Sequence, residues 1–373
     1  MPNKDTIGYR PTWAEVNLDN LEYNFKQVKS LLQPKTKVLV TVKADAYGHG
    51  LIAVAKRLVA CGVDYLGVAS IDEGIELREA GIKNPILLLG LILKEDIEPL
   101  FTYQLIPTIC DLKMAIVLNA RAAVVKQRIP VHIKVDTGMG RIGILPKDAF
   151  KLVSHISKFK HIQIQGIFTH FPLADADRKF TAKQISSFNQ LVNDLKKLGI
   201  IIPLVHAANS IGLIRYRNSH FTMVRPGLVV YGLYPKKNLG LNLKPVLALK
   251  TRVVFVKPMG PGSGISYGLT YVTKRPTQIV TLPIGYGDGY PRNLSNLAWL
   301  LIGGRRFKIS GRICMDQIMV DVGNFKTRIG DEVVLIGRQG KQKVTAEELA
   351  ALSGTISYEI VCGLGSRIPR IYK

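Results

Sequence analysis

Short apolar runs rich in β-branched residues recur along the first two thirds of the chain, and most are separated by segments with helical periodicity. Eight such runs precede residue 235: 38–43, 65–70, 85–90, 105–110, 131–137, 162–170, 203–207 and 222–232. Helical spacing of apolar residues is clearest between them at 71–80, 112–125, 146–159 and 181–198. This alternation predicts an N-terminal (β/α)8 barrel of the TIM type.

The pattern changes after about residue 240. Strand-like runs lie between turns that contain Gly or Pro, at 253–256, 278–282, 307–310 and 332–336. Helical spacing returns only at 346–352. We therefore expect two domains, a barrel over residues 1–240 and a mostly β C-terminal domain over residues 241–373.

Composition narrows the class of protein. A hydrophobic content of 47% is enough for a globular core, and the apolar run 86–93 is too short to span a membrane. Residues 1–5 have no apolar signal-peptide core, so we expect a cytoplasmic protein with no membrane partner. The four cysteines form no Cys-x-x-Cys pair, which indicates neither a zinc site nor a redox pair, and we expect no metal.

The net charge of +24, from 51 basic and 27 acidic residues, raises the question of nucleic acid. The basic residues are scattered, and their densest groups, at 305–308 and 196–197, are short. A basic, solvated surface is the favoured interpretation, so we expect no nucleic-acid partner. The charge can still steer anionic ligands towards the protein.

Several polar residues fall at or just after the C-terminal ends of the predicted barrel strands, the face on which such barrels place their active sites. They are Lys43, Ser70, Thr137, His170 and Ser210. Lys43 is the most informative, because it ends a buried run where an ammonium group is costly to desolvate. A desolvated lysine has a lowered pKa and can form a Schiff base with a carbonyl cofactor. The alternative is that its side chain only extends into water from the strand end.

The segment VKADAYGHG at residues 42–50 resembles the pyridoxal 5'-phosphate (PLP) attachment segment of alanine racemases. The similarity extends over nearly the whole chain, from Trp13 to Arg370. It implies a PLP-dependent homodimer that interconverts L- and D-alanine and, in bacteria, supplies D-alanine for peptidoglycan. It also implies that the C-terminal domain contributes to the partner subunit's active site.

A PLP enzyme needs a Schiff-base lysine, a phosphate cradle and a partner for the pyridine nitrogen. Ser210 and Gly227 lie at the seventh and eighth runs, where such barrels often bind phosphate, although Ser210 alone could be a helix N-cap. The resemblance implies that Arg225, supported by His170, faces the pyridine nitrogen. Since arginine only donates, it would leave that nitrogen unprotonated and limit side reactions. The phosphate contacts implied by the resemblance are Tyr47, Ser210, Gly227, Leu228 and Tyr358.

Racemisation needs two bases that face each other across the cofactor, one on each side of the reacting carbon. The resemblance implies that Lys43 serves one face and Tyr267 the other. An unperturbed phenol has a pKa of about 10, so a base role for Tyr267 needs nearby positive charge. The resemblance also implies that Tyr267 comes from the other subunit. Considered alone, Tyr267 is an aromatic residue in a turn.

Substrate recognition is assigned by a second motif, at residues 134–143, in which Gly138 and Gly140 let the loop approach a ligand closely. By resemblance, Arg141 contacts the substrate carboxylate and Lys134, when carbamylated, orients that arginine. The partner's loop would close the pocket through Met315 and its neighbour Asp316, while Tyr286 and Tyr358 narrow the entrance. The outer entrance implied by the resemblance consists of Asp175, His206, Arg292 and Arg312.

Other interpretations stay open. A racemase of broader specificity would commonly carry an export signal, which we do not find. An amino-acid decarboxylase would share the architecture, but its usual glycine-rich phosphate segment and cysteine-containing partner motif are not seen. A non-catalytic PLP-binding protein would lack the second domain and the Tyr267 and Met315 motifs. A nucleic-acid-binding protein is suggested by charge alone.

Overall fold

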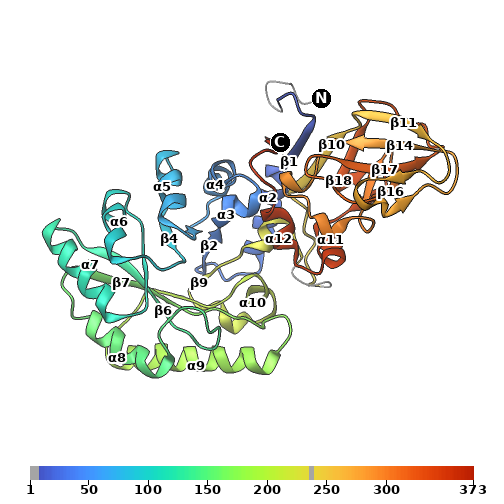
Figure 1. Cartoon of the computed structure of the whole chain (residues 1–373). Helices are drawn as coiled ribbons and strands as arrows, with labels where there is room; N and C mark the ends of the chain where they lie inside the picture. The colour runs from blue at the N-terminus through green and yellow to red at the C-terminus, as the bar shows by residue number, and fades with distance from the viewer. Residues whose placement is uncertain (1–7, 235–238) are drawn as a thin grey trace.

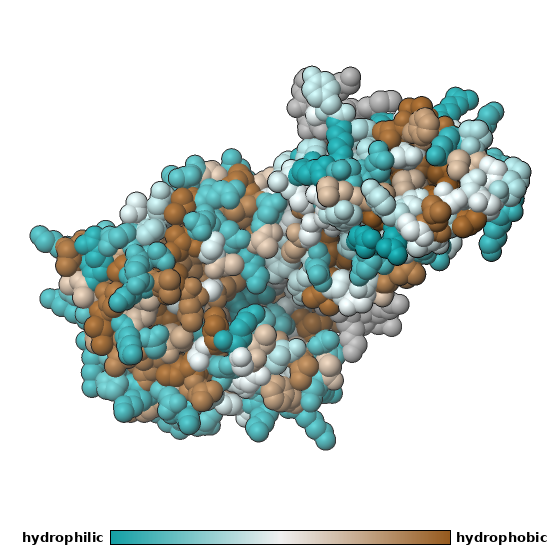
Figure 2. Space-filling view, viewed as in Figure 1, coloured by the Kyte–Doolittle hydropathy of each residue, from teal (hydrophilic) through white to brown (hydrophobic). Residues whose placement is uncertain are grey.

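The computed structural model describes residues 8–234 and 239–373, which fold into two lobes (Figure 1). The larger lobe is the barrel, and the smaller lobe contains the C-terminal strands. Figure 2 shows hydrophilic residues around the outer rim of both lobes in the same view. Within the described ranges, none of the helices combines the length and hydropathy that crossing a membrane requires.

Eight parallel strands form the barrel in the order β4-β3-β2-β9-β8-β7-β6-β5. They are β2 (Lys37–Thr41), β3 (Tyr65–Val68), β4 (Ile86–Leu88), β5 (Thr108–Ile109), β6 (Ile129–Lys134), β7 (Ile162–Phe168), β8 (Leu204–His206) and β9 (Met223–Val224). A parallel bridge between Leu87 and Ile106 joins the two ends of the sheet, which is therefore nearly closed. Such strands are buried on both faces, which explains their continuous apolar runs. The predicted barrel is confirmed.

The eighth strand is shorter than the apolar run that predicted it. The run covers 222–232, but β9 ends at Val224 and the 3-10 helix η3 (Leu228–Tyr231) follows. Pro226 lies between them and has no backbone N–H to continue a strand ladder. All four residues of η3 are nevertheless buried. The apolar run at 222–232 therefore indicated buried residues, but only its first part forms a strand.

Helices surround the barrel: α2 (Leu18–Ser30), α3 (Lys43–Gly48), α4 (Leu51–Ala60), α5 (Ile71–Glu79), α6 (Glu98–Thr102), α7 (Leu112–Val124), α8 (Pro146–Ile156), α9 (Arg178–Lys197) and α10 (Ser210–Arg215). The four helices predicted from spacing correspond to α5, α7, α8 and α9, with ends that shift by a few residues. In α8 the buried residues follow the expected period, at Ala149, Leu152, Val153 and Ile156.

The C-terminal lobe is mostly β. Its strands are β10 (Leu247–Arg252), β11 (Phe255–Met259), β12 (Gly264–Ile265), β13 (Tyr271–Val272), β14 (Thr277–Leu282), β15 (Trp299–Ile302), β16 (Arg305–Lys308), β17 (Ile318–Gly323), β18 (Glu332–Gln339), β19 (Gln342–Val344) and β20 (Arg370–Tyr372), with helices α11 (Ala346–Ser353) and α12 (Ser357–Cys362). The predicted run 253–256 spans a break, because β10 ends at Arg252 and β11 begins at Phe255.

The first strand of the chain belongs to the sheet of the C-terminal lobe. β1 (Thr12–Val16) pairs antiparallel with β10 and parallel with β20. These partners are far along the sequence, so the pairing ties both ends of the chain into one sheet between the lobes (Figure 1). Trp13 and Val16 are completely buried there.

Helix α12 brings the C-terminal segment to the barrel, where it packs on α3. The approach is close: a Cβ on Gly48 would lie 2.2 Å from the carbonyl oxygen of Val361. Gly48 also has a positive φ of 75°, which favours glycine. Two side chains of α12, Tyr358 and Cys362, thereby reach the barrel mouth.

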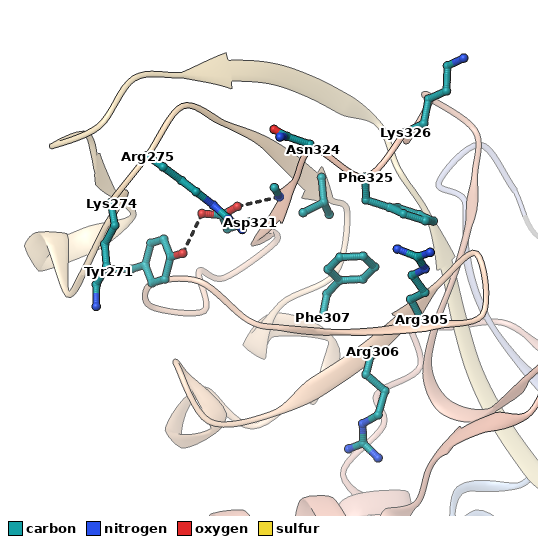
Figure 3. Close-up of a pocket in the computed structure, with 12 residues that line it drawn as sticks. Tyr271, Lys274, Arg275, Arg305, Arg306, Phe307, Asp321, Asn324, Phe325 and Lys326 are labelled. Atoms are coloured by element: carbon teal, nitrogen blue, oxygen red, sulfur yellow. Dashed lines mark hydrogen bonds between the residues drawn. The ribbon is translucent and has the colours of Figure 1, made fainter.

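The C-terminal lobe also displays part of the positive charge. Figure 3 shows basic residues around one pocket: Lys274, Arg275, Arg305 and Lys326. Among the described residues that line it, Asp321 alone is acidic, and its carboxylate accepts hydrogen bonds from the Tyr271 hydroxyl at 2.7 Å and the Gly323 backbone N–H at 2.8 Å. The charge here is therefore exposed, as expected from the scattered basic residues.

Candidate active site

Lys43 lies at the C-terminal end of β2 and lines a cavity of about 570 Å³ at the barrel mouth. It is half-buried, and burial together with the nearby Arg141 lowers its pKa below the usual lysine value. Both effects disfavour the ammonium form. The structure therefore gives Lys43 the environment expected for a reactive amine.

The backbone that follows Lys43 is left-handed. Ala44, Asp45, Ala46 and Tyr47 all have φ between 51° and 57°, where residues with a Cβ are disfavoured by about 1–2 kcal/mol each. The sequence signals only part of this turn, through the glycines that follow it. A run of strained residues next to a candidate catalytic lysine is typical of a functional site.

Glu73 of α5 holds this turn against the barrel. One oxygen of its carboxylate accepts a hydrogen bond from the Ala44 N–H at 2.5 Å, and the other accepts one from the Ala69 N–H at 2.7 Å. The turn also caps α4, because the Asp45 carboxylate accepts from the Leu51 N–H at 2.7 Å. These bonds compensate part of the backbone strain and fix the direction in which Lys43 leaves β2.

Lys134 ends β6 and is only 2% exposed. Its ammonium lies 4.4 Å from the centre of the Phe168 ring, and no hydrogen-bond or ion-pair partner is found for it in the described part of the chain. Burial and the charge of Arg225 place the pKa of Lys134 well below the usual lysine value. An unpaired buried lysine indicates a site built for an anion or for modification.

Arg141 also lines the cavity, from the loop after β6. Asp136 shapes that loop by accepting three backbone hydrogen bonds, from Gly138 at 2.9 Å, Met139 at 2.7 Å and Gly140 at 2.8 Å. Gly138 has a φ of 136° and a Cβ there would lie 2.7 Å from the Phe180 ring, so the glycine is needed.

Arg225 follows β9 and is 5% exposed. Its Nη2 donates to the carbonyl oxygens of Thr169 at 2.6 Å and Ala207 at 3.0 Å, and its Nη1 donates to Nδ1 of His206 at 2.8 Å. Nδ1 of His170 lies 3.4 Å from Nη2. Burial, with a smaller effect of Arg141, lowers the pKa of Arg225 to about 9, so it remains protonated at neutral pH.

His206 is not at the outer entrance, contrary to the prediction. It is fully buried in β8 and is the shorter of the two histidine contacts of Arg225. The physical reason is its position as the last residue of a short strand whose side chain points into the barrel. The predicted support of Arg225 by His170 is thus only part of the arrangement, and His206 was missed.

A cradle for a small group lies between the ends of β8 and β9. The Gly227 N–H donates to Oγ of Ser210 at 3.1 Å, and a Cβ on Gly227 would lie 2.7 Å from the Tyr47 hydroxyl. Leu228 and Tyr358 complete the lining. The predicted alternative for Ser210 is wrong: Asn209 is the N-cap of α10, with its side-chain oxygen accepting from the Gly212 N–H at 2.9 Å.

The charges around the cavity have one sign. Four basic residues line it: Lys43, Lys134, Arg141 and Arg225. None of the lining residues in the described structure is acidic. Burial lowers the pKa of His170 well below its usual value, so this histidine is neutral. Like charges gathered without a counterion imply a ligand with several negative charges. PLP fits this cavity, because it carries a phosphate, a phenolate and an aldehyde for Lys43.

The C-terminal candidates do not reach this cavity within one chain. Tyr267 is 70% exposed, Met315 is 53% exposed and Tyr286 is 40% exposed, and none of them lines it. The segments that carry Tyr286 and Met315 are hydrogen-bonded to each other: the Tyr286 N–H donates to the Cys314 carbonyl at 3.0 Å, and the Gly287 N–H donates to the Met315 carbonyl at 2.8 Å. Asp316 accepts from Nη2 of Arg367 at 2.7 Å. Asp175, Arg292 and Arg312 likewise lie outside the cavity lining.

A parallel barrel whose mouth holds a half-buried lysine and further basic side chains has the architecture of a barrel enzyme, in which the active site lies at the C-terminal ends of the strands. The sequence matches the alanine racemase N-terminal domain family over residues 16–235 and the alanine racemase C-terminal domain family over residues 246–372. The chain therefore belongs to the alanine racemase family and is an enzyme of the isomerase class, as the motifs predicted.

Individual relatives agree over nearly full length. The alanine racemase of Halothermothrix orenii is 51% identical, covering 98% of this chain and 97% of that protein. The alanine racemase of Clostridium difficile 630 has a TM-score of 0.94 at 40% identity and covers 98% of this chain and 96% of that one. The Bacillus anthracis alanine racemase with bound L-Ala-P has a TM-score of 0.91 at 35% identity, covering 98% and 95%.

Proposed function

We propose that this protein interconverts L- and D-alanine with PLP, by a two-base mechanism that uses Lys43 and Tyr267. The observation that carries the proposal is the cavity at the barrel mouth, where Lys43, with a lowered pKa, lies with Arg141 and Arg225, and where none of the described lining residues is acidic. The lining residues match the chemical groups of PLP in kind. Family membership adds the substrate, since the relatives are alanine racemases.

When bound, PLP supplies a conjugated ring that delocalises negative charge from the substrate α-carbon. In our proposal Lys43 holds the aldehyde, and the phosphate is bound by Tyr47, Ser210, Gly227, Leu228 and Tyr358. Arg225 donates to the pyridine nitrogen, with His170 beside it. Because Arg225 cannot give up its proton at neutral pH, the nitrogen stays unprotonated and the α-carbon is steered towards proton exchange rather than other reactions.

The two proposed bases lie in different surroundings. The lowered pKa of Lys43 increases the fraction of neutral amine, which can accept the α-proton on one face. Tyr267 would act on the other face, and its large exposure in one chain supports delivery to a second chain. We therefore propose a homodimer in which each active site uses both subunits.

Substrate binding is proposed for Arg141 and for the partner's loop at Met315. Arg141 is exposed to the cavity on a loop that Asp136 holds rigidly, which suits a carboxylate. Asp316 and Tyr286 would support the partner's loop. We propose that Lys134 acts as a carbamate: conversion to an anion would remove its unfavourable burial as a cation and give Arg141 a counterion.

The proposed cellular role is the supply of D-alanine for peptidoglycan from the cytoplasm, and it rests on the family resemblance. A strain that lacks this gene and its paralogues should then require D-alanine for growth. Growth without D-alanine in such a strain would contradict the proposed role but not the enzymatic activity.

The decisive experiment follows L-alanine in D₂O with the PLP-loaded protein, by NMR for α-deuteration and by chiral chromatography for D-alanine. Deuterated D-alanine is the expected product, since protons leave one face and return on the other. Deuteration without D-alanine would contradict the two-base proposal. If neither change occurs with alanine, racemisation of alanine is excluded, and a panel of other amino acids then tests the broader-specificity alternative.

A further inference from the structure

A line of polar side chains runs from Arg225 through the inside of the barrel, in which the two histidines are buried and the final glutamine is partly buried. Nη1 of Arg225 lies 2.8 Å from Nδ1 of His206, and Nε2 of His206 lies 2.9 Å from Nδ1 of His132. Nε2 of His132 lies 3.4 Å from Oε1 of Gln165. His132 and His206 are completely buried, so water does not satisfy these groups.

A local irregularity in the sheet makes this line possible. In the pairing of β6 with β7, Val131 is opposite Ile164 but His132 is opposite Gly166, so Gln165 is the extra residue of a bulge. Bulges redirect side chains, and this one brings Gln165 to the His132 ring. A Cβ on Gly166 would lie 2.4 Å from that ring, so the glycine provides the space for His132.

The hydrogen bonds have only one consistent direction. Arginine has no acceptor, so Nδ1 of His206 must accept and, in a neutral ring, its Nε2 must carry the proton. Nε2–H of His206 then donates to Nδ1 of His132, and Nε2–H of His132 donates to the Gln165 carbonyl oxygen. A cationic His206 would instead place an N–H against the Arg225 N–H.

We infer that His132 and Gln165 are positioning residues for Arg225, because together they provide the acceptor that the Nε2–H of His206 needs while its Nδ1 accepts from the guanidinium. This inference rests on the proposed function in that Arg225 faces the cofactor. The neutral state of both rings is consistent with their burial, which lowers the pKa of His132 to about 3 and that of His206 well below its usual value. With Nη1 held by His206 and Nη2 by two carbonyls, the guanidinium has one orientation at the cavity wall.

The tautomers can be measured directly in protein labelled with ¹⁵N only at its seven histidines. Without cofactor and near neutral pH, His132 and His206 should both show a protonated Nε2 and a bare Nδ1, with the two signals assigned by single His→Gln variants. A protonated Nδ1 on either ring would overturn the inference. This result does not depend on racemisation, so it stays separate from the alanine experiment in D₂O.

The variant Gln165→Leu removes the acceptor at the end of the line, and Gln163→Leu is the matched control, since Gln163 lies on the same strand but is exposed. Gln165→Leu should give His132 mixed tautomers, so that its Nδ1 no longer always accepts from His206, and should lower kcat about tenfold with little change in KM, because Arg225 is then held less firmly in its single orientation. Unchanged tautomers would overturn the role of Gln165. Should Gln165→Leu fail to fold, Gln165→Glu keeps an acceptor and should retain both tautomers; their loss there would equally contradict the inference.

Discussion

The barrel mouth and the face of the C-terminal lobe that carries Tyr267 differ in how complete they are within one chain. At the mouth, Lys134 and Arg225 are almost fully buried, and the cations already surround a cavity. On the other face, Tyr267 is 70% exposed and does not line that cavity. This difference supports our proposal that each active site combines the barrel mouth of one chain with the Tyr267 turn of another.

The exposed turn that carries Tyr267 has a well-defined conformation. Tyr267 begins the 3-10 turn η4 (Tyr267–Leu269), and its neighbours Ser266 and Leu269 have positive φ values of 65° and 45°. The hydroxyl of Ser266 donates to the Arg312 carbonyl at 2.5 Å, which anchors the turn. Strain held in place on an exposed turn is expected where a side chain must be presented in one direction.

Removing Lys43 tests the barrel-mouth part of the proposed site and should have the largest effect on activity. Lys43→Ala should lower racemisation at least about 1000-fold, because both the cofactor attachment and one base are lost. The absorption band of the covalently bound cofactor should disappear with it. Lys37→Ala is the control, since Lys37 is an exposed lysine at the start of β2, the strand that precedes Lys43. A retained absorption band in Lys43→Ala would assign the attachment to another lysine.

Removing the Tyr267 hydroxyl tests the part of the proposed site that lies on the C-terminal lobe. Tyr267→Phe should lower the rate about 100- to 1000-fold. Exchange of the α-proton for deuterium should become unequal, with one enantiomer still exchanging through Lys43. Tyr9→Phe serves as the control at another exposed tyrosine. Equal exchange from both enantiomers at a near-normal rate would remove Tyr267 from the mechanism.

Mixing the two variants tests whether Lys43 and Tyr267 of one active site come from different chains. In an equal mixture of Lys43→Ala and Tyr267→Phe, half of the dimers are mixed and one of their two sites is intact, so about a quarter of the activity should return. Sites formed within one chain would give no recovery. Subunit exchange must be demonstrated separately, for example with two affinity tags.

The same contrast explains what the sequence could predict. The barrel strands were predictable because strands buried on both faces need apolar residues throughout, and Lys43 stood out at the end of one of them. Helix α8 was predictable from the period of its buried face. In both cases the signal is local, because a few consecutive residues determine the environment.

Features that depend on distant contacts were not predicted. The pairing of β1 with β10 and β20 joins residues that are far apart in sequence. The resemblance assigned His206 to the outer entrance, and only the folded barrel shows that its Nδ1 lies 2.8 Å from the Arg225 guanidinium. The left-handed turn after Lys43 was also missed, because alanine has no intrinsic preference for that conformation and Glu73 stabilises it from another helix.

The smallest expected effect concerns stability at the mouth. Lys134→Met should stabilise the cofactor-free protein by about 1–4 kcal/mol at pH 7, because it replaces an almost fully buried lysine that has no anionic partner among the described residues. Since the pKa of Lys134 is lowered on folding, the unfolded chain binds more protons between that pKa and the usual value. Wild-type stability should therefore rise with pH through this window, and its difference from Lys134→Met should shrink.

Denaturant unfolding at pH 7 and pH 9, at one protein concentration and with bicarbonate removed, measures this difference. The exposed Lys37→Met is the matched control and should change stability by less than about 0.5 kcal/mol. A destabilised Lys134→Met would mean that Lys134 makes a favourable interaction. If that interaction then requires bicarbonate, a carbamate on Lys134 next to Arg141 explains it. The charged groups of the barrel mouth would then be complete only after Lys134 is modified. If Lys134→Met is stabilised as expected, the cost of burying Lys134 is part of how the barrel alone prepares an anion site.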